Sequence, residues 1–383
     1  MGYAPSVGTN SGIERAGEDR DAPDIDRVEV AAYSVPTDQQ EADGTASWDS
    51  TTMVCATVGA GGCSGWGWTY APAACASLIS GLFEGSLLGH SAWTIPAAHE
   101  RMRVAARNAG TLGPSAYALS AVDVALWDLK ARLAGMRLVD LLGVARAEVP
   151  VYGSGGFTTY DASTLTEQLE GWMAQGIDSV KIKIGEDWGH RAGRDLERVE
   201  QVRRVVGPDR EVMVDANGGY RRKQAVRVGR ALESLGVTWF EEPVSSDDKA
   251  GLAELRATLD LDITAGEYAN DVYEARRLCE VVDCLQIDAT RCGGISGWLR
   301  AAAVAASYGL DVSAHCAPHL HVLTGAAVPN MRHIEWFHDH VRIEERYLDG
   351  CAGVSEGVLT PGTGSTGHGY ELKTRDLERY RVA

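Results

Sequence analysis

The second half of the chain alternates short apolar runs with helical stretches, and this alternation restricts the fold more than any other feature. Eight apolar runs occupy residues 149–153, 179–184, 211–216, 237–242, 262–267, 284–289, 310–315 and 332–337. Helical patterns such as 195–206, 222–235 and 297–308 lie between them. Strands that alternate with helices are typical of βα units on a parallel sheet. We therefore expect eight parallel strands in this part of the chain.

Seven of the eight runs carry a titratable residue at or near the carboxyl end. In a closed eight-stranded parallel barrel these ends form one rim, which is where active sites lie. A doubly wound open sheet would instead gather its polar residues at a single switch point. The pattern therefore predicts an α/β barrel over residues 146–350, with an active site at its rim.

The first part of the chain has a different pattern. Residues 1–26 are polar, rich in Gly and Asp and aperiodic, so we expect a disordered tail. Strand-like runs at 27–35, 51–58 and 62–70 suggest an antiparallel meander, with a polar loop at 37–48 between the first two. Apolar residues at helical spacing from 118 to 129 follow. We expect an α+β region over residues 27–145.

Charge and cysteine content limit the possible partners. The 383 residues carry a formal net charge of −17, which argues against nucleic acid or an anionic membrane surface as a partner. No uninterrupted apolar run approaches the roughly 18 residues of a membrane span. Eight scattered cysteines without a C-x-x-C pair, and no basic-then-apolar leader, predict a cytoplasmic enzyme with free thiols.

Three successive predicted strands end in carboxylates, namely Asp215, Glu241 and Glu267, each 26 residues from the next. This spacing is one βα unit, so the three should stand at equivalent places on neighbouring strands. Converging carboxylates repel one another unless a cation lies among them. Ligands that are all oxygen point to Mg²⁺, with Mn²⁺ as an alternative. Helix N-capping explains any one of the three, but not three in regular succession.

Two pairs of residues flank these carboxylates in the sequence. Lys181 and Lys183 alternate with apolar residues, so both point to one face of a strand. On an exposed edge strand they would lie in water. In a barrel they reach the mouth, where Lys181 should lower the pKa of Lys183 and leave an amine that accepts a proton. Asp288 and His315 end consecutive strands, so the carboxylate can hold one ring nitrogen while the other faces substrate. A structural role for the histidine is the alternative.

Weaker candidates surround this set. Asn217, Tyr220 and Arg291 are possible contacts for a hydroxyl or carboxylate. The loop 36–48, which ends in Trp48, is a candidate lid together with the "GWGW" tryptophans Trp66 and Trp68, or else a flexible hairpin loop. His319 and His321 follow His315 and invite a zinc interpretation, but a histidine-rich loop is the better explanation beside a complete oxygen site. Glu335 ends the last strand and is either functional or a surface residue.

Taken together, "KIK", "VDAN", "FEEP", "GE", the Asp of "QIDA", "SAH" and "HIEW" resemble the enolase superfamily, mandelate racemase subgroup, over residues 27 to about 370. The resemblance implies a modified barrel, (β/α)7β, under an α+β capping domain (27–145) that residues 351–383 complete. It implies Mg²⁺ on Asp215, Glu241 and Glu267, and opposed acid/base groups in Lys183 and the His315–Asp288 pair. Glu335 and Lys181 would contact the carboxylate of a small-molecule substrate. It further implies a homo-oligomer, either a dimer or an octamer.

The resemblance, together with the polar candidates at the rim, favours a dehydratase that converts an acid sugar, an aldonate or aldarate, into a 2-keto-3-deoxy acid. The same residues permit a racemase or epimerase of an α-substituted carboxylic acid. A catalytically silent protein that only holds a metal is the third interpretation, disfavoured because every acid/base position is filled. The muconate cycloisomerase and dipeptide epimerase branch would have a lysine where Asp288 stands, so Asp288 argues against that branch.

Overall fold

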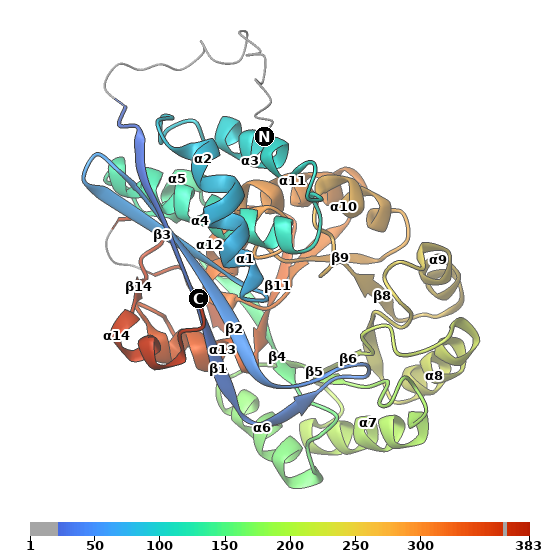
Figure 1. The fold of residues 1–383 in the computed structure, drawn as a ribbon. Helices are drawn as coiled ribbons and strands as arrows, with labels where there is room; N and C mark the ends of the chain where they lie inside the picture. The colour runs from blue at the N-terminus through green and yellow to red at the C-terminus, as the bar shows by residue number, and fades with distance from the viewer. Residues whose placement is uncertain (1–21, 363–365) are drawn as a thin grey trace.

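The computed structural model describes residues 22–362 and 366–383 (Figure 1). Most of the predicted tail, residues 1–21, lies outside the described residues. The end predicted for it, residue 26, is late, because the first strand begins at Ile25. Ile25 is buried and donates its amide N–H to the carbonyl of His90 (2.9 Å), which fixes the start of the strand.

Eight parallel strands close into a barrel, as the sequence predicts. They are β4 (Val149–Gly155), β5 (Ser179–Lys183), β6 (Glu211–Asp215), β7 (Val237–Glu241), β8 (Asp262–Ala265), β9 (Cys284–Ile287), β10 (Asp311–Ala314) and β11 (Met331–Phe337). Each pairs with the next in chain order, and β11 pairs with β4 to close the sheet. The carboxyl ends of all eight strands therefore face one rim.

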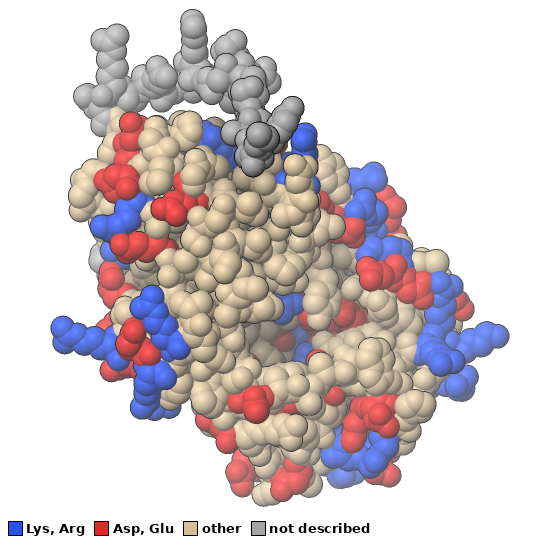
Figure 2. Space-filling view, in the orientation of Figure 1, with Lys and Arg blue, Asp and Glu red and all other residues tan. Residues whose placement is uncertain are grey.

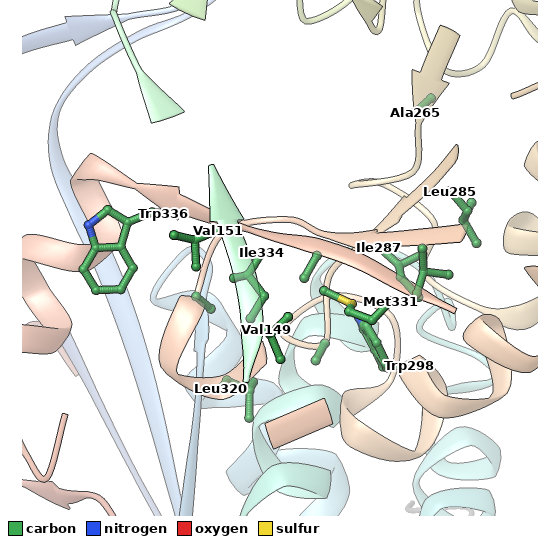
Figure 3. Packing of buried hydrophobic residues seen from close by; sticks show 14 of the residues in the cluster. Val149, Val151, Ala265, Leu285, Ile287, Trp298, Leu320, Met331, Ile334 and Trp336 are labelled. Atoms are coloured by element: carbon green, nitrogen blue, oxygen red, sulfur yellow. The ribbon is translucent and has the colours of Figure 1, made fainter. Parts of the chain in front are cut away.

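Helices connect the strands and cover the outside of the barrel. They are α6 (Ala162–Ala174), α7 (Ala192–Val206), α8 (Arg222–Ser234), α9 (Lys249–Thr258), α10 (Val272–Cys279), α11 (Gly294–Ser307) and α12 (Pro318–Ala326), and α13 (His338–Tyr347) follows the last strand. Figure 3 shows Trp298 of α11 and Leu320 of α12 packed against the strands that carry Ile287, Ile334 and Val149. A helix joins each strand to the next, so the fold is a modified (β/α)7β barrel.

A three-stranded antiparallel sheet and a helical layer precede the barrel. The strands are β1 (Ile25–Ala42), β2 (Ser47–Ala60) and β3 (Cys63–Tyr70). The helical segments are α1 (Ala74–Leu78), a π-helical turn (Ile79–Phe83), α2 (Glu84–Leu87), α3 (Ile95–Ala106), α4 (Pro114–Leu133) and α5 (Leu138–Leu142). Residues 143–148 separate α5 from β4 and form the domain boundary that we propose.

The polar stretch 37–48 is mostly strand, so its prediction as a loop was wrong. Glu41 pairs with Trp48 and Ala42 with Ser47, which leaves only residues 43–46 for the turn. The hairpin is held against the barrel, because Thr158 donates its N–H to the carbonyl of Ala42 (2.8 Å). The contact with the barrel gives the polar segment a hydrogen-bond partner that its own sequence does not reveal, because the segment has no strand periodicity.

Gly67 explains why the "GWGW" segment lies where it does. A Cβ atom at Gly67 would lie 2.5 Å from the carbonyl oxygen of Ala121 in α4, so only glycine allows this close contact. The tryptophans point to the other face. Trp66 and Trp68 are 7% and 0% exposed, and their indole N–H groups donate to the Tyr370 carbonyl and to Glu344. They are core residues, and their prediction as parts of a lid was wrong.

The last segment of the chain contacts both parts of the molecule. It contains β12 (Leu348–Asp349), β13 (Val358–Leu359), β14 (Glu371–Leu372), α14 (Thr374–Leu377) and a 3-10 turn (Glu378–Tyr380). β13 adds an antiparallel strand to β4, while the chain end pairs with β1 through Ala32 N–H and the Ala383 carbonyl (3.0 Å).

All eight cysteines are free thiols. Within residues 22–362 and 366–383, no helix has the length and apolarity needed to cross a membrane.

Candidate active site at the barrel rim

The three predicted metal ligands come together at the rim. Asp215 ends β6 and lies directly beside Glu241 at the end of β7, while Glu267 follows β8 by two residues. One carboxylate oxygen of each residue lies within 4.8 Å of the others, and all three side chains are buried. Neighbouring strands therefore produce the convergence that the 26-residue spacing predicts.

The chemistry of this cluster fits a hard divalent cation. Its donor atoms are all carboxylate oxygens, which Mg²⁺ prefers. Burial, and next the charge of Asp215, raise the pKa of Glu241 to about 8. Among the described residues, Glu241 Oε1 has no hydrogen-bond partner, although it is buried. A bound cation would give this buried oxygen a partner and would balance the charges of the three neighbouring carboxylates.

The two lysines of "KIK" each contact one of these carboxylates. Lys181 Nζ lies 2.6 Å from Glu241 Oε2 and 2.9 Å from Glu335 Oε1, and Lys183 Nζ forms an ion pair with Asp215. Burial favours the neutral amine of Lys183, but the charges of Asp215, Glu335 and Glu267 together outweigh burial, so the pKa of Lys183 is raised. We expected Lys181 to lower this pKa. Lys181 does act in that direction, but the charge of Asp215 has the larger effect.

His315 and Asp288 form the predicted pair. His315 Nδ1 donates to Asp288 Oδ2 (2.8 Å), and His315 Nε2 points to Glu267 Oε2 at 3.2 Å. Burial would raise the pKa of Asp288, but the hydrogen bond from His315, together with the charges of His315 and Arg291, outweighs burial and lowers that pKa to about 2. The pKa of His315 is raised despite its burial, because Cys316, Glu267 and Asp288 favour the charged ring. The imidazole is thus oriented with Nε2 toward the rim.

A cavity of about 400 Å³ opens above these residues, between the barrel and the β1–β2 hairpin. Figure 2 shows this face hollowed near its middle, with charged side chains visible inside the hollow. Six of the predicted site residues line the cavity: Trp48, Lys183, Asn217, Glu267, Arg291 and His315. The other five lie behind this lining: Lys181, Asp215, Glu241, Asp288 and Glu335.

Lys181 and Glu335 support the rim from behind the lining. Glu335 Oε1 accepts from the Ser154 hydroxyl (2.6 Å), and Oε2 accepts from the Cys316 N–H (2.8 Å). Burial acts to raise the pKa of Glu335, but Lys181 and His315 lower it on balance. Both carboxylate oxygens thus have protein partners, and direct contact of Lys181 or Glu335 with substrate remains a prediction.

The remaining predicted contacts have distinct surroundings. Arg291 Nη1 pairs with Glu267 Oε1 (3.0 Å) and its guanidinium lies over the ring of Tyr268. Trp48 donates its indole N–H to Glu41 (2.9 Å) and packs edge-on against Phe157. Asn217 has a left-handed backbone (φ 44°) and a buried side-chain oxygen without a hydrogen-bond partner among the described residues.

Three other candidates have structural roles. Tyr220 donates its hydroxyl to Asp195 (2.6 Å) and does not line the cavity. His319 pairs with Glu344 (2.7 Å), and His321 Nε2 accepts the N–H of Ala289 (2.8 Å). Neither histidine belongs to a potential metal cluster within the described residues, which agrees with the structural interpretation of both.

Sequence reasoning missed much of the cavity wall. Asp43 lies in the predicted lid 36–48, although it was not singled out. The missed residues are Ser50, Thr51, Thr52, Tyr70, Ala71 and Pro72 before the barrel, and Tyr268, Cys316, Phe337, Asp339 and His340 within it. Several follow a recognised motif directly: Tyr268 follows Glu267, and Cys316 follows His315. The residues before the barrel come close only through docking of the hairpin, which no local pattern reveals.

Comparisons with known proteins agree with this architecture. Residues 28–143 match the family model of the mandelate racemase / muconate lactonizing enzyme N-terminal domain, and residues 164–377 match the enolase C-terminal domain-like model. The fold and these two matches therefore define an enzyme of the capped-barrel type, with a carboxylate cluster at the rim. The chain belongs to the enolase superfamily, mandelate racemase subgroup.

Three similar proteins illustrate the range of relatives. L-talarate/galactarate dehydratase from Salmonella typhimurium is 33% identical over 71% of this chain and 69% of its own. A mandelate racemase/muconate lactonizing enzyme-like protein from Rubrobacter xylanophilus is 45% identical, with a TM-score of 0.91 over 94% of this chain and all of its own. A racemase from Streptomyces coelicolor with bound magnesium is 28% identical, with a TM-score of 0.88 over 94% and 100%. Other relatives are named as acid-sugar dehydratases, cycloisomerases and epimerases.

Proposed function

We propose that this protein is a Mg²⁺-dependent dehydratase of acid sugars, which removes water from an aldonate or aldarate and yields a 2-keto-3-deoxy acid. One observation carries the proposal. Lys183 from β5 and His315 directly after β10 reach a single cavity on either side of the carboxylates of β6 to β8, and Asp288, directly after β9, holds His315 by a hydrogen bond. Dehydratases among the relatives add support. Its free thiols suit the cytoplasm, where we place it.

Asp215, Glu241 and Glu267 would hold the Mg²⁺ ion. When bound, the ion supplies Lewis acidity and positive charge for the carboxylate of the substrate, whose α-hydrogen is otherwise only very weakly acidic. The buried lysine Lys181 fixes the orientation of Glu241 by its 2.6 Å contact. The protein thus holds the ligand oxygens in place before substrate arrives.

Lys183 acts as the base in this proposal. It removes the α-hydrogen as a proton, and the electron pair of that C–H bond moves into the carboxylate to give an enediolate. Lys183 must first be neutral, and its ion pair with Asp215 opposes this. Loss of its proton therefore requires the charge of Asp215 to be balanced by another partner.

His315 acts as the acid. Its Nε2 donates a proton to the β-hydroxyl, the C–O bond breaks, and water leaves as the enediolate collapses to an enol that becomes the keto acid. Asp288 holds Nδ1–H, fixes the tautomer and stabilises the charged ring before the transfer. The two side chains therefore act on two different bonds.

A racemase is the second candidate, since Lys183 and His315 both reach the cavity. One of the two residues could remove the α-proton and the other could return a proton to the opposite face. Purified protein with Mg²⁺ should be tested against a library of acid sugars for 2-keto product, with mandelate and amino-acid-derived carboxylates in parallel. Keto acid from an acid sugar is the expected result. Racemisation of another acid without any keto product would replace the dehydratase by the racemase.

A further inference from the structure

We propose that the preferred substrate is a monocarboxylate whose far end is an uncharged polyol, an aldonate and not an aldarate. This inference rests on the proposed function and narrows its substrate class. One carboxylate of any substrate belongs at the metal cluster, so the question is what the rest of the cavity offers to a second one. The charged residues that line the cavity away from the metal cluster decide this.

The β1–β2 hairpin that covers the cavity carries only negative charge. Residues 36–52 contain Asp38, Glu41, Asp43 and Asp49, and no lysine, arginine or histidine. Asp43 itself lines the cavity, together with the neutral hydroxyls of Ser50, Thr51 and Thr52. A carboxylate that approached this wall would meet hydroxyl donors and like charges, but no cation.

The residues of α13 that line the cavity next to Thr51 also offer no free cation. Asp339 lines the cavity and accepts the hydroxyl of Thr51. Arg342 Nε donates to Asp339 Oδ1 (2.8 Å), but Arg342 does not line the cavity. The positive charge of Arg342 is therefore already balanced by Asp339 and is not offered to a ligand. His340 is stacked on Tyr70, and burial lowers its pKa, so the ring is neutral there.

The basic side chains at the rim that line the cavity already have carboxylate partners, and His315 pairs with Asp288 and Glu267. Lys183 pairs with Asp215, and Arg291 pairs with Glu267 and lies 3.6 Å from Asp288. Each sits at the rim, where the reacting carboxylate belongs. A second carboxylate would have to lose part of its hydration without gaining an ion pair, which is unfavourable. A terminal hydroxyl would find donors and acceptors on Ser50, Thr51 and Asp339.

The test uses matched pairs that differ only at the terminal carbon, such as D-gluconate with D-glucarate and D-galactonate with galactarate. Pairs are compared by kcat/KM with Mg²⁺ and by calorimetric binding to the inactive Lys183→Ala protein. The expected result is a preference of about tenfold or more for the monoacid of the productive pair, since the site lacks a charge partner for the second carboxylate. Equal or better turnover and binding of the diacid overturns the inference and leaves the dehydratase intact.

A charge added at the wall makes the test sharper. Ser50→Lys places a cation in the cavity and should raise the diacid-to-monoacid ratio of kcat/KM by about tenfold. Ser47→Lys adds the same charge to the same hairpin at an exposed position outside the cavity, and should leave the ratio unchanged. An unchanged ratio in Ser50→Lys, or equal shifts in both variants, would count against the assignment of this wall. Failure of every acid sugar to bind the Lys183→Ala protein would instead reject the proposed function, and this inference with it.

Discussion

Asp288→Asn separates the orientation of the acid from the removal of the α-proton. In the structure, Asp288 accepts from His315 Nδ1 at 2.8 Å, and both side chains are buried. Asparagine has nearly the same shape but no charge, so the ring loses the partner that favours its protonated form. Lys183 and the carboxylates of the metal cluster lie on other strands and keep their contacts. Dehydration should therefore suffer more than proton abstraction.

The size of the effect follows from the bond that is weakened. A hydrogen bond to a charged group contributes about 1.5–3 kcal/mol. Each 1.36 kcal/mol changes a rate about tenfold, so the rate of keto-acid formation should fall about 10- to 150-fold. The loss is smaller than for removal of His315 itself, because the imidazole remains and the introduced asparagine can still hold Nδ1–H through its amide oxygen.

The assay follows keto acid and α-hydrogen exchange in D₂O in one reaction by NMR. Asp283→Asn provides the control, since Asp283 stands just before the other end of the same strand and pairs with Arg256 (2.8 Å). This control should dehydrate like the wild type. Equal losses of exchange and dehydration in Asp288→Asn would show a general disruption of the site, and a normal dehydration rate would refute the positioning role.

Three further outcomes follow from the structure. Lys183→Ala should lower turnover by orders of magnitude, because no other amine lines the cavity beside the metal cluster within the described residues, and a small primary amine added to the assay should restore part of it. Glu241→Gln should abolish activity while circular dichroism shows an intact fold, and near-normal turnover would reject the three-carboxylate site. Stability should fall between about pH 6.5 and 10, because the pKa of His319 is raised to about 10: burial opposes the charged ring, but hydrogen bonds to Cys351 and Glu344 outweigh it. The folded protein then holds more protons than the unfolded chain in that range, so urea unfolding at several pH values should show a slope that His319→Gln reduces.

The barrel could be predicted from the sequence because its signals are local. Each strand is a short apolar run, and each rim residue stands at a strand end, as Asp215 and Glu241 show. Parallel pairing then brings neighbouring ends together without further information. The same reasoning placed His315 and Asp288 on adjacent strands, where the structure joins them by a hydrogen bond.

Features that depend on packing between distant segments were not predictable in this way. Glu41 and Ala42 pair with Trp48 and Ser47 of β2, and the hairpin is docked on the barrel by the hydrogen bond from Thr158 to Ala42. The burial of Trp68 depends on Glu344, which is 276 residues away in the chain. The pKa of Lys183 depends on the distance to Asp215 as well as to Lys181, and alternation along one strand reveals only the second of these.

The central claim is that Lys183 and His315 act on different bonds, and His315→Asn tests it most directly. With the true substrate and Mg²⁺ in D₂O, this variant lacks the proton donor for the leaving hydroxyl but keeps Lys183 and its ion pair with Asp215. NMR should show exchange of the α-hydrogen for deuterium without formation of keto acid. Keto acid formed by His315→Asn at the wild-type rate would contradict the assignment of the general acid and, with it, the proposed mechanism.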